Sequence, residues 1–163
     1  MIFNRQDKYI VNTSRLEEYV GEVGQALGLG RRQCNVCLVD DREIKRLNSF
    51  YRAVRRATDV LSFPWDAETD RPRTRIRARR AEPRYTCRSA GECSAPEFKH
   101  FLGDIVISVE TARRNARRER HSTLNEIRWL ILHGVLHLLG YDHESDKGEM
   151  AELELSLRQR LGI

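Results

Sequence analysis

Three of the chain's five histidines fall within one short segment, HGVLHLLGYDH at positions 133–143. The residues before it, LNEIRWLIL at 124–132, are apolar on nearly every face, which predicts a helix buried in the middle of a domain. His133 and His137 are then one helical turn apart and point the same way. Gly140 can adopt a positive φ and end the helix, so the chain can turn back and bring His143 to the same point. The rest of the chain must be organised around this helix.

The spacing of these histidines indicates a metal site. Three imidazole nitrogens that converge on one point form a coordination shell with one position left open, as in catalytic rather than structural zinc sites. We therefore predict that His133, His137 and His143 bind one zinc ion per chain. The alternative is two histidines satisfied in the core and one at the surface. That alternative does not explain spacings of four and six residues with a glycine at the turn.

The pattern H-x-x-x-H-x-x-G-x-x-H is similar to that of the metzincin peptidases, with one departure at position 134. Where those enzymes carry a glutamate that acts as general base, this chain has Gly134. Because glycine cannot accept a proton, a peptidase interpretation loses its catalytic base.

Further motifs accompany the histidine segment: TDVLSFP at 58–64, LGDIVIS at 102–108, and Leu47-Asn48 followed by Arg52. Together they resemble the YbeY family of bacterial metallo-endoribonucleases, from about Ser14 to Leu161 apart from one insert. The resemblance implies a zinc-dependent, single-strand-specific endoribonuclease that acts in maturation of the 3′ end of small-subunit (16S) ribosomal RNA and in ribosome quality control. It also implies that ribosomal RNA and the small ribosomal subunit are the partners. Arg52 matches the family's LN-x-x-x-R position, so we expect it near the metal as a catalytic residue.

Length and composition favour one domain spanning residues 1–163. A chain of 163 residues with 40% hydrophobic content is long enough to bury a core. No apolar run approaches the ~20 residues that span a bilayer, and the first residues lack the apolar core of a signal peptide. We expect a cytoplasmic protein with no membrane partner. Four cysteines in such a chain are expected to be thiols, with no disulfide partner.

Hydrophobic periodicity predicts alternating helices and strands. We expect an α+β fold of zincin-like architecture, in which a small mixed four-stranded sheet packs beside the central metal-binding helix. The expected elements are a helix with a capping box from Ser14 to Glu17, a strand at 33–40, a short helix at 41–48, a strand at 58–63 closed by Pro64, a strand at 102–109, a polar helix at 110–120, the metal-binding helix capped by Thr123 and Glu126, and a closing helix marked by Met150, Leu153, Leu157 and Leu161.

Cys34 and Cys37 form a C-x-x-C pair within the strand expected at 33–40. A strand sends residues three apart to opposite faces, which argues against a shared zinc or redox site. We expect two small buried side chains.

Residues 66–100 form an insert that the family usually lacks. Their only large aliphatic or phenylalanine side chains are Ile76 and Phe98, so we expect a disordered, Arg-rich loop that cannot bury enough surface to offset its ordering entropy. Between Arg71 and Arg88 it carries eight arginines and one acid, a local charge of +7, whereas the whole chain is +5. The insert either binds RNA phosphates without sequence preference or serves as a solubilising loop.

Three function classes stay open on these observations. The first is an RNA hydrolase, for which Arg113 and Arg117 on the polar helix are candidate RNA-binding residues. The second is a zinc peptidase of metzincin-like type, favoured by the histidine spacing alone. The third is an RNA-binding ribosome-assembly factor whose zinc is structural. Asp142 or Glu144 could orient a ligand histidine, or both could be exposed carboxylates in a turn.

Overall fold

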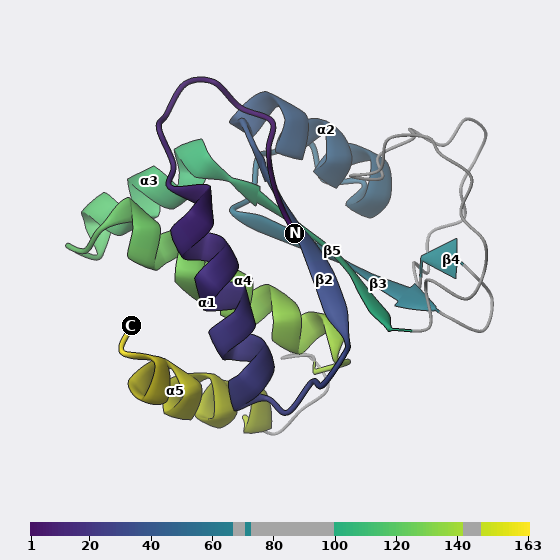
Figure 1. Ribbon diagram of the computed structural model, residues 1–163. Helices are drawn as coiled ribbons and strands as arrows, with labels where there is room; N and C mark the ends of the chain where they lie inside the picture. Colours follow the sequence, from purple (N-terminus) through teal and green to yellow (C-terminus); the bar gives the residue numbers. More distant parts are fainter. Residues whose placement is uncertain (67–70, 73–99, 142–147) are drawn as a thin grey trace.

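The computed structural model describes residues 1–66, 71–72, 100–141 and 148–163 (Figure 1). Its four-stranded mixed sheet has the order β1-β2-β5-β3, and the two residues of β4 extend the β3 edge. The strands β1, β2 and β5 are parallel, while β3 is antiparallel to β5. The strands are β1 Ile2–Asn4, β2 Gln33–Val39, β3 Val60–Asp66, β4 Arg71–Pro72 and β5 Phe101–Ser108, and the helices are α1 Thr13–Ala26, α2 Asp41–Arg52, α3 Val109–Arg118, α4 Thr123–Leu138 and α5 Glu149–Leu161.

Helices cover both faces of the sheet, which confirms the predicted α+β class (Figure 1). One face packs on α1 and α4, where Val36 of β2 and Ile105 of β5 belong to the main hydrophobic core. The other face packs on α2, where Val106 of β5 meets Ile44 and Leu47 in a smaller core. In the described part of the chain, no helix is long and apolar enough to cross a lipid bilayer.

The two cysteines of β2 lie on opposite faces of the sheet. Cys34 belongs to the core beneath α1 and α4, and Cys37 belongs to the core beneath α2. Both are buried thiols, and burial raises the pKa of Cys34 to about 11. The prediction that the strand sends these two side chains to opposite faces and buries both is therefore confirmed.

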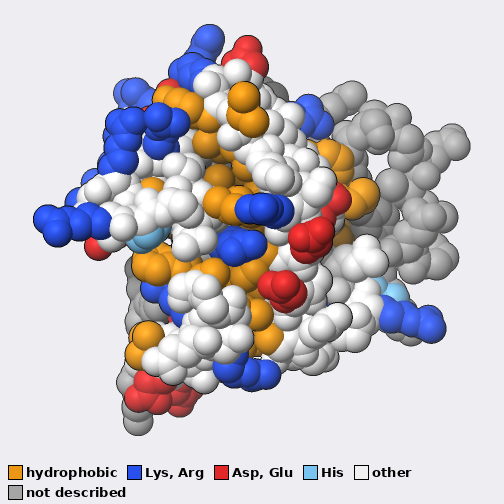
Figure 2. Space-filling model, turned by 60° about the vertical axis from the view of Figure 1, so that its left-hand side comes forward, with side chains coloured by type: hydrophobic (Ala, Val, Ile, Leu, Met, Phe, Trp, Pro, Cys, Tyr) orange, Lys and Arg blue, Asp and Glu red, His pale blue; other side chains and the backbone are white. Residues whose placement is uncertain are grey.

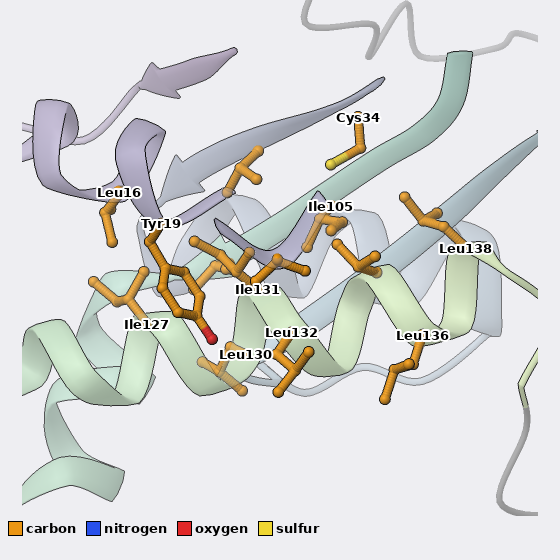
Figure 3. Packing of buried hydrophobic residues seen from close by; sticks show 14 of the residues in the cluster. Leu16, Tyr19, Cys34, Ile105, Ile127, Leu130, Ile131, Leu132, Leu136 and Leu138 are labelled. Carbon is orange, nitrogen blue, oxygen red and sulfur yellow. The ribbon is translucent and has the colours of Figure 1, made fainter. Parts of the chain in front are cut away.

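The helix α4 runs along the inner face of the sheet and is buried over most of its length. Its residues Ile127, Ile131 and Leu132 have no exposed surface, and Tyr19 of α1 packs among them (Figure 3). The helix contacts the sheet and also α1, α3 and α5, which explains why its sequence is apolar on nearly every face.

At position 134, α4 packs closely against the sheet. A Cβ atom added to Gly134 would lie 2.8 Å from Cγ2 of Ile105, closer than side chains tolerate. The carbonyl of Gly134 also accepts a hydrogen bond of 3.4 Å from Oγ of Ser62 on β3. A glutamate at this position would have to displace the Ile105 side chain, so the packing favours glycine here.

Several predicted boundaries were wrong by a few residues. Asn12, not Ser14, caps α1 by accepting a hydrogen bond from the backbone N–H of Arg15, and Ser122, not Thr123, caps α4 in the same way. Pro64 does not end β3: its pairing with β5 stops at Pro64, but the strand continues to Asp66, where Trp65 and Asp66 pair with β4. The helix α2 continues past Asn48 to Arg52. Local capping signals allow such shifts, since neighbouring Ser, Thr and Asn side chains all compete for the same orphan N–H groups.

The predicted disordered insert lies almost entirely outside the described residues. Only its ends are described: Asp66 at the end of β3, the two residues of β4, and His100 before β5. The prediction of disorder and the division into a domain with an insert stay predictions.

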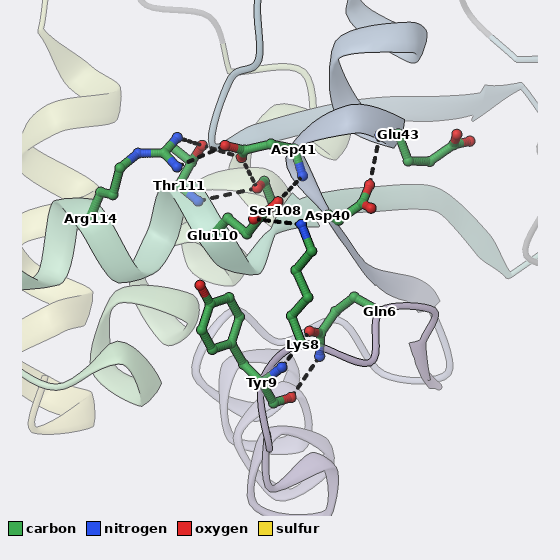
Figure 4. A network of polar contacts seen from close by, with 10 residues as sticks. All are labelled: Gln6, Lys8, Tyr9, Asp40, Asp41, Glu43, Ser108, Glu110, Thr111 and Arg114. Carbon is green, nitrogen blue, oxygen red and sulfur yellow. Dashed lines mark hydrogen bonds and ion pairs between the residues drawn. The ribbon is translucent and has the colours of Figure 1, made fainter.

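A polar network ties the start of α2 to the start of α3 (Figure 4). The carboxylate of Asp41 accepts hydrogen bonds from Oγ of Ser108 at 2.5 Å, Oγ1 of Thr111 at 2.7 Å and Nη1 of Arg114 at 2.7 Å. Partial burial raises the pKa of Asp41, but the hydrogen bonds from Arg114, Ser108 and Thr111 outweigh it, so the pKa lies below its usual value. The ionised carboxylate therefore holds α2 and α3 together over the end of β5.

We predict that Gly134→Ala destabilises the protein by about 1–3 kcal/mol, the usual cost of overpacking a well-filled core. The added methyl group must displace Ile105, whose branched side chain cannot yield as a flexible one would. Chemical denaturation followed by circular dichroism measures the change. The matched control is Gly21→Ala on α1, where nothing lies within 4 Å of the added Cβ. It should stabilise the protein by up to about 1 kcal/mol, the helix propensity gain. Equal effects at both positions would contradict the close approach of α4 to β5.

A second prediction concerns pH. Asp41→Asn should lower the free energy of unfolding at neutral pH, because an amide offers one acceptor oxygen and no charge to three donors. A depressed native pKa contributes stability above the ordinary value of 3.8 and loses it as the pH falls through the lowered pKa. The difference between the two proteins should therefore shrink in acid, as measured by urea unfolding between pH 7 and pH 2. Asp7→Asn, at an exposed carboxylate, is the control and should show no such trend. A difference independent of pH would refute the role of the charge.

Candidate metal centre

The imidazole rings of His133 and His137 meet on one side of α4. Their centroids are 4.6 Å apart, and the planes cross at 79°. The two Nε2 atoms lie 3.0 Å from each other. The spacing of four residues thus brings both rings to a common point, as the sequence predicted from one helical turn.

The Nδ1 atoms of the two rings point away from that common point, and each has a partner. Nδ1 of His137 lies 2.9 Å from the backbone carbonyl oxygen of Tyr141. Nδ1 of His133 lies 3.1 Å from Oε2 of Glu154 on α5. One ring is therefore oriented from the end of its own helix, and the other from a different helix.

The turn after α4 delivers the carbonyl to His137. The backbone N–H of Tyr141 donates to the carbonyl of Leu136 at 3.1 Å, and that of Gly140 donates to the carbonyl of His137 at 3.1 Å. This pair of bonds is the Schellman motif, and it requires the left-handed φ of 96° that Gly140 adopts. The predicted helix end is confirmed, and the same glycine positions the partner of a site histidine.

These partners determine where the ring protons lie. A carbonyl oxygen can only accept a hydrogen bond, so Nδ1 of His137 carries a hydrogen. The ionised carboxylate of Glu154 likewise only accepts, so Nδ1 of His133 carries a hydrogen. In the neutral rings both Nε2 atoms then hold a lone pair, and these lone pairs face each other across 3.0 Å. The two lone pairs repel each other unless a metal ion lies between them or one ring gains a proton and donates it to the other.

Glu154 is itself held in place. It is buried, its Oε1 accepts a hydrogen bond from Nη2 of Arg158 one turn further along α5, and the Arg158 guanidinium stacks 4.2 Å from the centroid of the Trp129 ring. Burial raises the pKa of Glu154, but the hydrogen bond to His133 and the charge of Arg158 outweigh it, so the pKa lies below its usual value. The carboxylate that faces His133 is therefore ionised at neutral pH.

The donor set fits a zinc ion. Two nitrogens that bind one tetrahedral zinc at about 2.0–2.1 Å lie about 3.3 Å apart, close to the observed separation of 3.0 Å. Each ring also donates its other N–H to an oxygen acceptor, as metal-binding histidines usually do. Among the described residues, no group of three or more His, Cys, Asp or Glu side chains is arranged to hold a metal. The predicted third ligand, His143, lies outside the described residues, as do Asp142 and Glu144.

Arg52 is the last residue of α2, and its side chain is exposed. The helix α2 packs on the sheet face opposite α4, so the sheet separates the body of α2 from the two histidines (Figure 1). The predicted place of Arg52 near the metal and its catalytic role stay predictions.

The candidate RNA-binding arginines both lie on α3, which packs beside α4. The guanidinium of Arg113 lies over the Tyr9 ring, 4.8 Å from its centroid, whereas Arg117 is exposed. Figure 2 shows that Lys and Arg side chains gather in several places on one face of the molecule, most densely at its upper left.

Sequence reasoning missed Glu154 and assigned the possible orienting role to Asp142 or Glu144. A signal was present: Met150, Glu154, Leu157 and Leu161 share one face of α5 at helical spacing. A carboxylate on an otherwise apolar stripe must have a buried partner. Its partner could not be read from the sequence, because nothing in the chain order says which helix α5 packs against.

The model of the family described as "Endoribonuclease YbeY" matches residues 1–162. A curated protein of that name from Nautilia profundicola is 40% identical over 132 residues, covering 81% of this chain and 74% of the relative. Another from Clostridium perfringens is 37% identical over 172 residues, covering 100% and 98%. A third from Caldanaerobacter subterraneus is 35% identical over 170 residues, covering 100% and 97%.

One solved structure is also similar, the solution structure of a protein from Thermotoga maritima. It superposes with a TM-score of 0.59 at 26% sequence identity, covering 99% of this chain and 89% of that protein. The arrangement of the sheet and helices described above is thus shared with an experimentally determined relative.

Proposed function

This chain belongs to the endoribonuclease YbeY family, and from that membership we propose that it is a zinc-dependent endoribonuclease that cuts single-stranded RNA. Its proposed roles are maturation of the 3′ end of small-subunit (16S) ribosomal RNA and ribosome quality control in the cytoplasm. The relatives that carry the family name are named as endoribonucleases, hydrolases that act on RNA.

One observation carries the metal part of this proposal. The Nε2 atoms of His133 and His137 face each other at 3.0 Å, and both Nδ1 hydrogens are engaged elsewhere. A divalent cation removes the repulsion between the two lone pairs and uses both of them. We assign this point as the zinc site.

His143 is the proposed third ligand. It follows Tyr141 by two residues, and the carbonyl of Tyr141 lies 2.9 Å from Nδ1 of His137. Two residues span at most about 7 Å, so the reach of the chain allows His143 to meet the other two rings. When bound there, zinc supplies a Lewis acid that polarises a phosphoryl oxygen and lowers the pKa of water. A fourth position left open to substrate is what three protein ligands provide.

The protein must also supply a cation for the phosphate. Cleavage of a phosphodiester builds negative charge on the non-bridging oxygens, and a guanidinium can meet two of them with paired donors. Arg52 is our candidate because of its place in the family motif. It is the last residue of α2 and its side chain is exposed, so a bound RNA can reach it.

The attacking group is either water or the RNA's own 2′-hydroxyl. In both cases the glutamate that serves as general base in the metzincin peptidases is missing, because position 134 is a glycine. Contacts to the rest of the RNA are assigned to Arg113, Arg117 and the Arg-rich insert, which together would add affinity through phosphates and not through base identity. The proposed partners are ribosomal RNA and the small ribosomal subunit.

The metal site predicts a stoichiometry. Purified protein should contain one zinc ion per chain, measured by inductively coupled plasma mass spectrometry after dialysis against a mild chelator. His143→Ala should lose most of this metal, because two imidazoles alone bind zinc weakly. His100→Ala is the control at an exposed histidine outside the cluster, and it should keep full occupancy. Full zinc occupancy in His143→Ala would show that the third ligand is another residue.

The phosphate role of Arg52 predicts a specific loss. Arg52→Lys should keep the fold and the zinc but lose ~10²-fold or more in RNA cleavage, the scale expected when one transition-state donor is removed. Arg55→Lys, at a neighbouring exposed arginine, is the matched control and should cleave normally. If Arg52→Lys cleaves RNA at the wild-type rate, Arg52 does not bind the phosphate and is an ordinary solvated surface charge.

The substrate class is tested in the same assay. We expect cleavage of a ribosomal RNA fragment in its single-stranded parts and no cleavage of casein. A 2′,3′-cyclic phosphate on the product would identify the 2′-hydroxyl as the nucleophile. Casein cleavage would instead support the peptidase, and RNA binding without cleavage would support an assembly factor with a structural zinc.

A further inference from the structure

We infer that Glu154 of α5 is a positioning residue that selects the metal-binding tautomer of His133, and that Arg158 fixes which atom of the side chain at position 154 faces the histidine. This inference rests on the proposed zinc site, since the selected tautomer matters only if Nε2 of His133 binds a metal. Neither residue would touch the metal or the RNA, so both act through the histidine.

The geometry gives the carboxylate two separate tasks. Its Oε2 accepts from Nδ1 of His133 at 3.1 Å, and its Oε1 accepts from Nη2 of Arg158. Both donors approach from fixed directions, because His133 is anchored in α4 and the Arg158 guanidinium is stacked on Trp129. Glu154 is 7% exposed, so water cannot easily replace either partner. Each oxygen of the carboxylate is thus committed to one donor.

Arg158 decides what happens when the carboxylate is replaced by an amide. In Glu154→Gln the side chain has one acceptor oxygen and one donor NH₂ group. A guanidinium has only donors, so the oxygen must face Arg158 and the NH₂ group must face His133. Nδ1 of His133 then has to accept, which moves the ring hydrogen to Nε2. That hydrogen occupies the position the metal needs and can instead form a hydrogen bond with Nε2 of His137.

The inference therefore predicts an unusual rescue. Glu154→Gln should lower zinc affinity by about 10–100-fold, the usual cost of losing an outer-shell partner of a metal ligand. The double variant Glu154→Gln with Arg158→Met should recover most of that loss, because the amide can then rotate and offer its oxygen to His133. Arg158→Met alone should change the affinity little, since Glu154 still faces the histidine. Methionine keeps an unbranched apolar chain against Trp129.

The experiment measures zinc affinity by competition with a chromophoric chelator in the wild type, the three variants and Glu152→Gln. Glu152 is an exposed carboxylate on the same helix, so its substitution removes the same charge without touching the site. The affinity of Glu152→Gln should equal that of the wild type. A second readout needs no metal: nitrogen NMR of the chelator-treated proteins above the ordinary histidine pKa of ~6.5 reports which ring nitrogen of His133 carries the hydrogen. We expect Nδ1 in the wild type and Nε2 in Glu154→Gln.

The outcomes separate this inference from the proposed function. If the wild type binds no zinc, the proposed metal site fails, while the NMR comparison still tests the control of the tautomer. If Glu154→Gln keeps both the wild-type affinity and the Nδ1 hydrogen, the positioning role is refuted. If it lowers only the melting temperature, Glu154 is a structural anchor of α5. If removing Arg158 fails to restore affinity, Arg158 does not direct the amide, and that part of the inference is overturned.

Discussion

The close packing of α4 on β5 is the contact on which the rest of the structure depends. Gly134 lets the helix approach Ile105 so closely that a single methyl group would not fit. Because α4 packs on the sheet beside α1 and is buried over most of its length, its two histidines are carried by a rigid element and not by a loop. A site on a rigid element keeps its geometry without help from the ligand. Position 134, where the metzincin peptidases carry their catalytic glutamate, is therefore also the position at which a glycine allows α4 to pack closely on β5.

Different hydrogen-bond acceptors orient the two histidines, and these acceptors differ in their separation from the histidine along the sequence. His137 is oriented by a carbonyl four residues away, which the Schellman turn at Gly140 delivers. His133 is oriented by Glu154, which lies on another helix. The contact at His137 is local and forms whenever α4 ends in the Schellman turn. The contact at His133 forms only when α5 packs against α4, so the docking of α5 and the orientation of His133 are linked.

Much of the fold followed from periodicity. The alternation of β2 placed Cys34 and Cys37 on opposite faces, and the apolar run before His133 predicted a buried helix. Boundaries were less secure, because Asn12 and Ser122 compete with their neighbours to cap the same N–H groups. The place of Arg52 near the metal, expected from the family motif, stays a prediction, because a motif records which residues occur together and not where their side chains lie.

The sequence by itself determined that His133 and His137 share one side of a helix, that this helix is buried, and that it ends at Gly140. Each of these follows from spacing along one segment, where helical geometry leaves no choice. Only the tertiary structure decided that Glu154 and Arg158 stand behind His133, and that the missing glutamate reflects contact with Ile105. Glu154 lies 21 positions from His133, and Ile105 lies 29 positions from Gly134. Their partners depend on which helix faces which face of the sheet, and that arrangement is set by the packing of the whole core.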